Sequence, residues 1–132
     1  MQSIIGTWAL VKAIATAADG SPRPAPFGGA KAMGRVTFNA DGRMMAVLCD
    51  GRPEMPGGER RGYSSYCGNY TFDGRTLITR VDAASDPARM GTDQIRQVSH
   101  EGDLMVLRPP LRSYDGAPEE QRVLWWRKIA EV

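Results

Sequence analysis

The sequence predicts an all-β protein, an eight-stranded antiparallel up-and-down barrel. Short runs that alternate apolar and polar residues recur along the chain, and turn-forming Gly, Pro and Asp residues separate them. No segment has the periodicity of an amphipathic helix, which argues against an α/β fold. The first and last runs lie near the two ends of the sequence, and pairing between these two strands would close the barrel. A seven- or eight-stranded sandwich stays the alternative.

The first half of the sequence predicts three strands. Residues 6–13 form the first, and residues 20–34 follow as a surface loop because prolines and glycines there prevent a regular ladder. Residues 36–38 and 44–48 are the next two strands. They are joined by a tight turn at Asp41-Gly42, where glycine supplies the positive φ that a hairpin needs.

The second half begins with another irregular stretch, residues 50–62, and then predicts five strands. Asp73-Gly74 marks a further hairpin turn, and Pro109 with Pro110 ends the seventh strand of the series. The five strands are expected at residues 66–72, 77–81, 94–98, 104–107 and 123–126.

Composition and charge exclude several classes of protein. The 132 residues fit one domain spanning residues 1–132. The 17 basic and 15 acidic residues give a formal charge of +2, which is too balanced for a nucleic-acid-binding protein. The first residues lack the features of a secretory signal, and no run approaches the roughly 18 apolar residues of a membrane span. We therefore expect a cytoplasmic protein without nucleic-acid partners or membrane insertion.

Metal and cofactor motifs are missing from the sequence. One histidine, His100, and two cysteines, Cys49 and Cys67, do not form a zinc-binding pattern. The paired glycines lack the lysine and the strand-to-helix setting of a phosphate-binding loop. We therefore expect no metal and no cofactor. In a reducing compartment the two cysteines are expected to be buried free thiols rather than a disulfide.

Strand alternation predicts which side chains face the interior. Tyr66, Gly68, Tyr70 and Phe72 share one face of their strand, and the aromatic character of that face indicates that it points inward. By the same alternation Thr79 shares the inner face of the following strand with its apolar neighbours. These residues predict a cavity wall that is partly phenolic.

The expected position of Arg96 on the sixth strand depends on the face that Val98 occupies. Gln94, Arg96 and Val98 share one face, which is inward if Val98 is buried. A buried guanidinium needs either a carboxylate partner or an anionic ligand. Asp82 and Asp93 are the candidate protein partners, and an outward position of Arg96 is the third alternative.

Other notable side chains are expected to be structural. Trp8 would close the floor of a barrel and pack on the last strand, and His100 would lie in solvent beside a turn. Met44, Met45 and Met105 are expected in the core or in a cavity wall, since flexible thioethers fill irregular space.

Several segments together resemble one family. They are Gly6-Thr7-Trp8-Ala9-Leu10-Val11, Pro26-Phe27-Gly28, Gly34-Arg35-Val36-Thr37-Phe38, Asp41-Gly42-Arg43-Met44, Tyr66-Cys67-Gly68-Asn69-Tyr70-Thr71, Gly91-Thr92-Asp93-Gln94-Ile95-Arg96, Glu101-Gly102-Asp103-Leu104 and Leu124-Trp125-Trp126. In order and spacing the chain resembles the lipocalin-like domain family, small calycin-type barrels of bacteria and fungi. The resemblance implies an eight-stranded barrel with a cavity at its open end. Where the family's closing strand often ends Trp-x-Arg, this chain has Lys128.

These observations lead to a functional hypothesis with two alternatives. We expect binding of a small apolar or amphipathic molecule, with an acidic or carbonyl end, in the barrel cavity. One alternative is a cofactor-independent isomerase or cyclase that uses the same cavity, and the other is a filled structural barrel whose outer face forms a homodimer. The expected ligand-binding residues are Tyr66, Tyr70, Thr79, Gln94 and Arg96.

Overall fold

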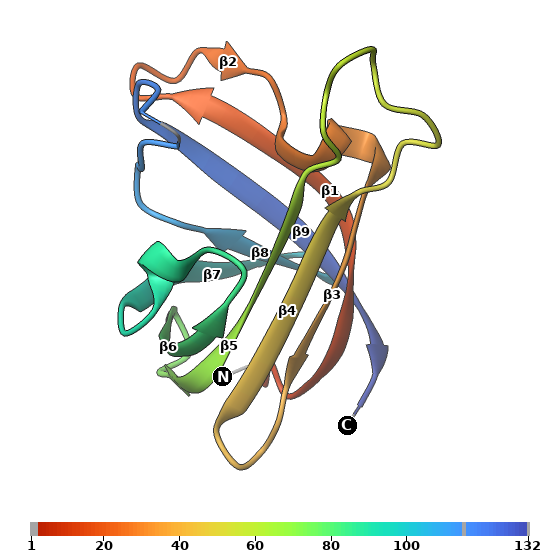
Figure 1. Cartoon of the computed structure of the whole chain (residues 1–132). Coiled ribbons are helices and arrows are strands. Elements are labelled where there is room, and N and C mark those ends of the chain that lie inside the picture. Colours follow the sequence, from red (N-terminus) through yellow and green to blue (C-terminus); the bar gives the residue numbers. More distant parts are fainter. Residues whose placement is uncertain (1–2, 115, 132) are drawn as a thin grey trace.

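A computed structural model describes residues 3–114 and 116–131 and shows a closed antiparallel barrel (Figure 1). Each strand pairs with the next long strand along the chain, and two short 3₁₀ turns, η1 and η2, lie in the connections. The elements are β1 Gly6–Ala17, β2 Pro22–Arg23, η1 Pro26–Lys31, β3 Ala32–Phe38, β4 Arg43–Asp50, β5 Tyr63–Phe72, β6 Thr76–Ala84, η2 Pro87–Arg89, β7 Asp93–Glu101, β8 Leu104–Arg108 and β9 Glu120–Ala130.

Pairing between the first and last strands decides between the barrel and the sandwich. β1 and β9 run antiparallel from the pair Thr7 and Ala130 to the pair Ala17 and Glu120. This ladder joins the two ends of the strand series, so the sheet has no free edge between its eight long strands. The predicted up-and-down barrel is confirmed, and β2 adds only a two-residue strand beside β1.

Alternation along β4 shows how the core is built. Met44, Ala46 and Leu48 are buried, whereas Met45 and Val47 between them are exposed. Met44 therefore lies in the core as expected, but the prediction for Met45 is wrong, because adjacent residues of a strand point to opposite faces of the sheet. Met45 lies on the outer surface with 56% of its area exposed.

The connection before β3 is more ordered than the sequence predicts. Residues 20–34 were expected to be a loop, yet Pro26–Lys31 form a 3₁₀ turn and β3 begins at Ala32. Phe27, Gly28 and Gly29 have positive φ values of 56°, 78° and 62°. Two glycines make this left-handed path accessible, and Phe27 adopts it as the one non-glycine residue with positive φ in the described part of the chain.

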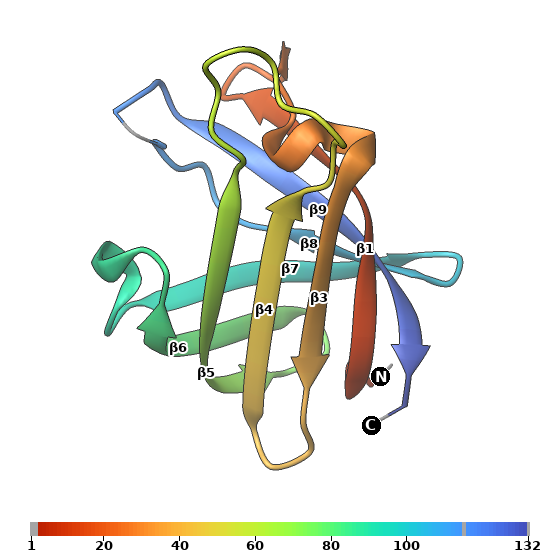
Figure 2. The same cartoon turned by 45° about the vertical axis from the view of Figure 1, so that its right-hand side comes forward.

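The two ends of the barrel differ in their connections. The long segments 18–31, 51–62, 85–92 and 109–119 all leave strands at one end, which we call the mouth. The short turns 39–42, 73–75 and 102–103 lie at the other end, which we call the floor. Both views place the start of β1 and the end of β9 on the side opposite the 51–62 loop (Figures 1 and 2).

Trp8 closes the floor, as predicted. Its indole N–H donates to the carbonyl oxygen of Ile4 at 2.9 Å, and both residues are buried. The Nζ atom of Lys128, on the last strand, lies 5.5 Å from the centroid of the Trp8 ring. Lysine thus supplies a cation beside the indole where the family pattern has arginine, without the flat stacking of a guanidinium.

The cysteines are free, as expected, but neither is fully buried. Cys49 and Cys67 are both partly exposed, because their positions alternate with the inward residues of β4 and β5. The Cys67 thiol lies 3.6 Å from a carboxylate oxygen of Asp82 on the outer surface.

Candidate ligand cavity

The barrel contains a cavity of about 60 Å³ that extends from the core toward the mouth. Its deep walls are apolar because every strand that contributes to them turns alternate residues inward. The apolar residues of this wall are Val36, Phe38, Met44, Ala46, Leu48, Leu77, Leu107, Leu124 and Trp126. A cavity must offer about 10–15 Å³ to hold one water molecule, so this space holds about four to six water-sized groups.

Polar side chains line the cavity only toward the mouth. They come from β5, η2, β7, the 109–119 connection and β9, so five separate segments meet there. The polar lining residues are Ser64, Tyr66, Arg89, Arg96, Tyr114 and Arg122. Apolar walls below a ring of polar groups are the usual construction of a small-molecule site.

η2 positions Arg89 over the cavity. Asp86 begins this turn as an N-cap, and its carboxylate accepts a hydrogen bond from the Ala88 backbone N–H at 3.0 Å. Pro87 follows at the first position of the turn, where a missing N–H costs little. The turn places the Arg89 guanidinium carbon 5.6 Å from the centroid of the Tyr66 ring, which is a cation–π distance.

The Arg89 guanidinium is in an unfavourable electrostatic environment. Burial lowers its pKa below the ordinary value, and the positive charges of Arg112 and Arg96 lower the pKa further. Its Nε atom is buried and has no hydrogen-bond partner among the described residues. A buried donor that has lost water and gained no acceptor is costly, so this atom calls for a specific explanation.

Arg96 lies in the cavity lining, but the expected carboxylate partners do not contact it. One terminal nitrogen of its guanidinium donates to the Gln94 side-chain oxygen at 3.1 Å, and the other donates to the carbonyl oxygen of Ile95 at 2.8 Å. Asp82 pairs with Arg43, and Asp93 pairs with the outward Arg80 at 3.3 Å. Arg96 therefore has neutral partners only, within the residues that the structure describes.

The third arginine of the lining, Arg122, differs from these two. Its Nε atom lies 2.8 Å from the carboxylate of Glu120, and its guanidinium carbon lies 3.5 Å from the centroid of the Tyr114 ring. Arg112 approaches the same ring at 5.4 Å. Arg122 is thus neutralised and stacked, and it forms a fixed wall of the mouth.

The five residues expected to bind a ligand lie in different surroundings. Tyr66 and Arg96 meet in the cavity lining, whereas the other three residues are not part of it. Tyr70 lies near the floor, where its hydroxyl donates to the Asn39 carbonyl at 2.8 Å, and burial raises its pKa. Thr79 is inward and only 1% exposed. Gln94 is 7% exposed and supports Arg96, so its contact with a ligand, like that of the other four, stays a prediction.

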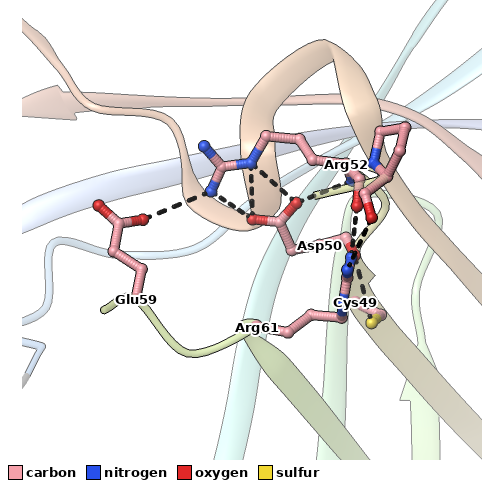
Figure 3. A network of polar contacts seen from close by, with 6 residues as sticks. Cys49, Asp50, Arg52, Glu59 and Arg61 are labelled. Carbon is pink, nitrogen blue, oxygen red and sulfur yellow. Dashed lines mark hydrogen bonds and ion pairs between the residues drawn. The ribbon is translucent and has the colours of Figure 1, made fainter. Parts of the chain in front are cut away.

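A network around Asp50 holds the loops over the mouth (Figure 3). Asp50 ends β4 with only 3% of its area exposed, and its carboxylate accepts hydrogen bonds from the Arg52 guanidinium at 2.6–3.1 Å. Arg61 donates to the carbonyl oxygens of Asp50 and Arg52 at 2.7 and 2.6 Å, and Glu59 lies 3.8 Å from Arg52. The network therefore fixes the 51–62 loop at both of its ends.

The same carboxylate also lies against η1. Gly28 packs so closely on Asp50 that a Cβ atom at this glycine would lie 2.8 Å from the carboxylate oxygen. Beside it, Phe27 lines the cavity, and a Cβ atom added at Gly62 would lie 3.5 Å from its ring. Asp50 thus connects the two mouth segments that cover the apolar space.

Arg89 and Phe27 are site residues that the sequence prediction missed. Both lie in segments that were expected to be irregular, where no strand alternation predicts the direction of a side chain. One signal did exist for Arg89, since Asp86-Pro87 combines an N-cap residue with a proline at the first turn position. That pattern predicts a helical turn at residues 87–89, but the direction of the Arg89 side chain depends on how the turn packs on the barrel.

Neither a metal centre nor a membrane-spanning helix is found in the described residues. Residues 3–114 and 116–131 contain no group of three or more His, Cys, Asp or Glu side chains placed to hold a metal ion. Over the same ranges no helix has the length and apolar character needed to cross a membrane. His100 lies at the floor end of β7, away from the mouth residues.

The closed barrel, its apolar cavity and its polar mouth define the class as a small up-and-down β-barrel with a ligand-type cavity. The family model of the lipocalin-like domain matches residues 5–129. The chain therefore belongs to the lipocalin-like domain family, as its segments indicated. No curated protein and no solved structure matches the chain.

Proposed function

We propose that this protein binds a small amphipathic molecule, with the apolar part in the barrel cavity and the polar end at the mouth. The observation that carries the proposal is the segregation of the lining, which is apolar in its depth and has arginines and tyrosines only toward the mouth. The buried Nε of Arg89, which has no acceptor among the described residues, supports the proposal because the polar end of a ligand would satisfy it. Family membership supports ligand binding in general terms.

Native mass spectrometry of the protein purified from its own host tests this proposal. We expect a stoichiometric small molecule that extraction can identify. The matched variants are Ala46→Leu, which fills the cavity from β4, and Ala83→Leu, which adds the same group at an exposed position of β6. Ala46→Leu should abolish uptake, whereas Ala83→Leu should retain it. Equal uptake by both variants would place the ligand outside the cavity and overturn the proposal.

Catalysis on the bound molecule is the second candidate function. The observation that favours it is the cation–π contact of Arg89 with Tyr66, because a phenol beside a guanidinium in a water-poor cavity can polarise a carbonyl. A cofactor-independent isomerase or cyclase would convert the captured molecule, and Tyr66→Phe would stop conversion without stopping uptake. Recovery of an unchanged molecule after prolonged incubation would favour a binding protein.

An outer apolar patch favours self-association of two copies. Met45, Val47 and Tyr63 lie on the outer faces of β4 and β5, with 56%, 47% and 58% of their areas exposed. A contiguous exposed apolar patch is typical of interaction surfaces. Sedimentation velocity should give a homodimer that Val47→Asp dissociates. A monomer mass at every concentration would contradict this assignment.

A further inference from the structure

The mouth holds positive charge that the described residues do not neutralise. The positive charges of Arg96 and Arg112 disfavour the charged form of Arg89. Within residues 3–114 and 116–131, none of the three has a salt-bridge partner. Like charges gathered in a partly buried site destabilise the protein unless an anion joins them.

Two acidic groups near the mouth, among the residues that the structure describes, already have other partners. Glu120 pairs with Arg122 and lies 3.9 Å from Arg23, while Asp93 pairs with Arg80 on the outer surface. Redirecting either carboxylate toward the cavity would break an existing pair. A ligand anion would neutralise the mouth without such a loss.

The available donors are suited to a planar anion. The Arg89 Nε has no acceptor, and guanidinium groups bind the two oxygens of a carboxylate with parallel hydrogen bonds. Directly below the arginines the wall turns apolar, with Leu48 and Leu124 in the lining. A third oxygen facing this wall would lose its hydration without gaining a donor, which favours a carboxylate over a phosphate.

The volume limits the rest of the molecule. A space of about 60 Å³ accepts about four to six water-sized groups, which is the size of a short alkyl chain or of one six-membered ring. A longer chain would have to extend out of this space through the mouth.

We propose that the ligand is a short-chain or single-ring carboxylic acid whose carboxylate binds between Arg89 and Arg96 at the mouth. This assignment rests on the proposed function, because it names the chemical class that the cavity accepts. The carboxylate satisfies the unpaired Arg89 Nε and neutralises the local excess of positive charge, and the hydrocarbon part fills the apolar space below.

Isothermal titration calorimetry with matched acids and amides tests this assignment. The probes are benzoate and benzamide, hexanoate and hexanamide, and phenyl phosphate, added to the full chain at neutral pH. The variants are Arg89→Gln and Arg96→Gln, and the control is Arg75→Gln, an exposed arginine at a floor turn. We expect the acids to bind more tightly than their amides in the wild type. Each cavity variant should weaken acid binding about ten- to a hundredfold, as for loss of a charged hydrogen bond, and leave amide binding unchanged.

Three results would overturn the carboxylate assignment while leaving the proposed binding function in place. Equal binding of acids and amides would leave the cavity as a binding site but remove the role of the anion. Tighter binding of phenyl phosphate than of benzoate would reject the carboxylate. An equal loss of acid and amide binding in Arg89→Gln would show that Arg89 only shapes the cavity. If no probe binds and no captured molecule is found, both proposals fail. Circular dichroism of each variant checks the fold. If Arg89→Gln unfolds, the comparison of acid and amide binding is made with Arg96→Gln alone.

Discussion

At the floor of the barrel the Trp8 indole N–H has an acceptor 2.9 Å away, whereas at the mouth the Nε of Arg89 has none among the described residues. The floor is built from short turns and buried aromatic rings, and the mouth is built from four long connections that bring in arginines. The indole Nε1 atoms of Trp125 and Trp126 on β9 also lack a partner among the described residues, but they are neutral. The mouth differs because its unsatisfied buried donor belongs to a charged group, which is the costlier case.

Matched aromatic substitutions at the two ends should give the largest difference in the free energy of unfolding between floor and mouth. Trp8→Ala removes a fully buried ring and should lower the free energy of unfolding by about 3–5 kcal/mol. Phe27→Ala at the mouth removes a half-buried ring and should cost about 1 kcal/mol. Urea denaturation followed by intrinsic fluorescence measures both values. Equal losses would show that the mouth contributes to stability as much as the floor does.

Acid should weaken the mouth through Asp50. Hydrogen bonds from the Arg52 side chain hold the pKa of the Asp50 carboxyl below its usual value. A lowered pKa in the folded state means that this stabilisation is complete above the unfolded value of about 3.9, and that it is lost as pH falls through the folded pKa. The wild type should therefore lose more stability between pH 6 and pH 3 than Asp50→Asn loses.

Asp103→Asn, at an exposed floor turn, is the control for this pH experiment. Urea denaturation at both pH values gives the comparison, and the control should show the full acid loss of the wild type. If Asp50→Asn shows that full loss too, the Asp50 network does not stabilise the mouth.

Two tyrosines on β5 should give the smallest difference in stability between floor and mouth. The Tyr70 hydroxyl donates to the Asn39 carbonyl near the floor, so Tyr70→Phe should cost about 0.5–1.5 kcal/mol. Tyr66 lines the cavity, and Tyr66→Phe should change stability by less than about 0.5 kcal/mol. Thermal unfolding of both variants is the measurement. The reverse order would place the structural hydroxyl at the mouth.

The sequence predicted the floor better than the mouth, for a physical reason. Strand alternation and Asp-Gly turns are local signals, so the eight strands, the inward Thr79 and the position of Trp8 followed from the residues themselves. The environment of Arg96 depends on how segments distant in sequence pack together. Two carboxylates were available to it in the sequence, and only the fold shows that Arg43 and Arg80 engage them instead.

Pairing of β1 with β9 also has a consequence for synthesis of the protein. Thr7 must meet Ala130, so the ladder that closes the barrel joins the most distant strands of the chain. Until β9 leaves the ribosome, β1 and β8 each present an unpaired edge on which another chain can assemble. Such long-range closure is typical of slowly folding β-proteins. A nascent chain of this protein is therefore most vulnerable to aggregation in the interval just before its last strand emerges.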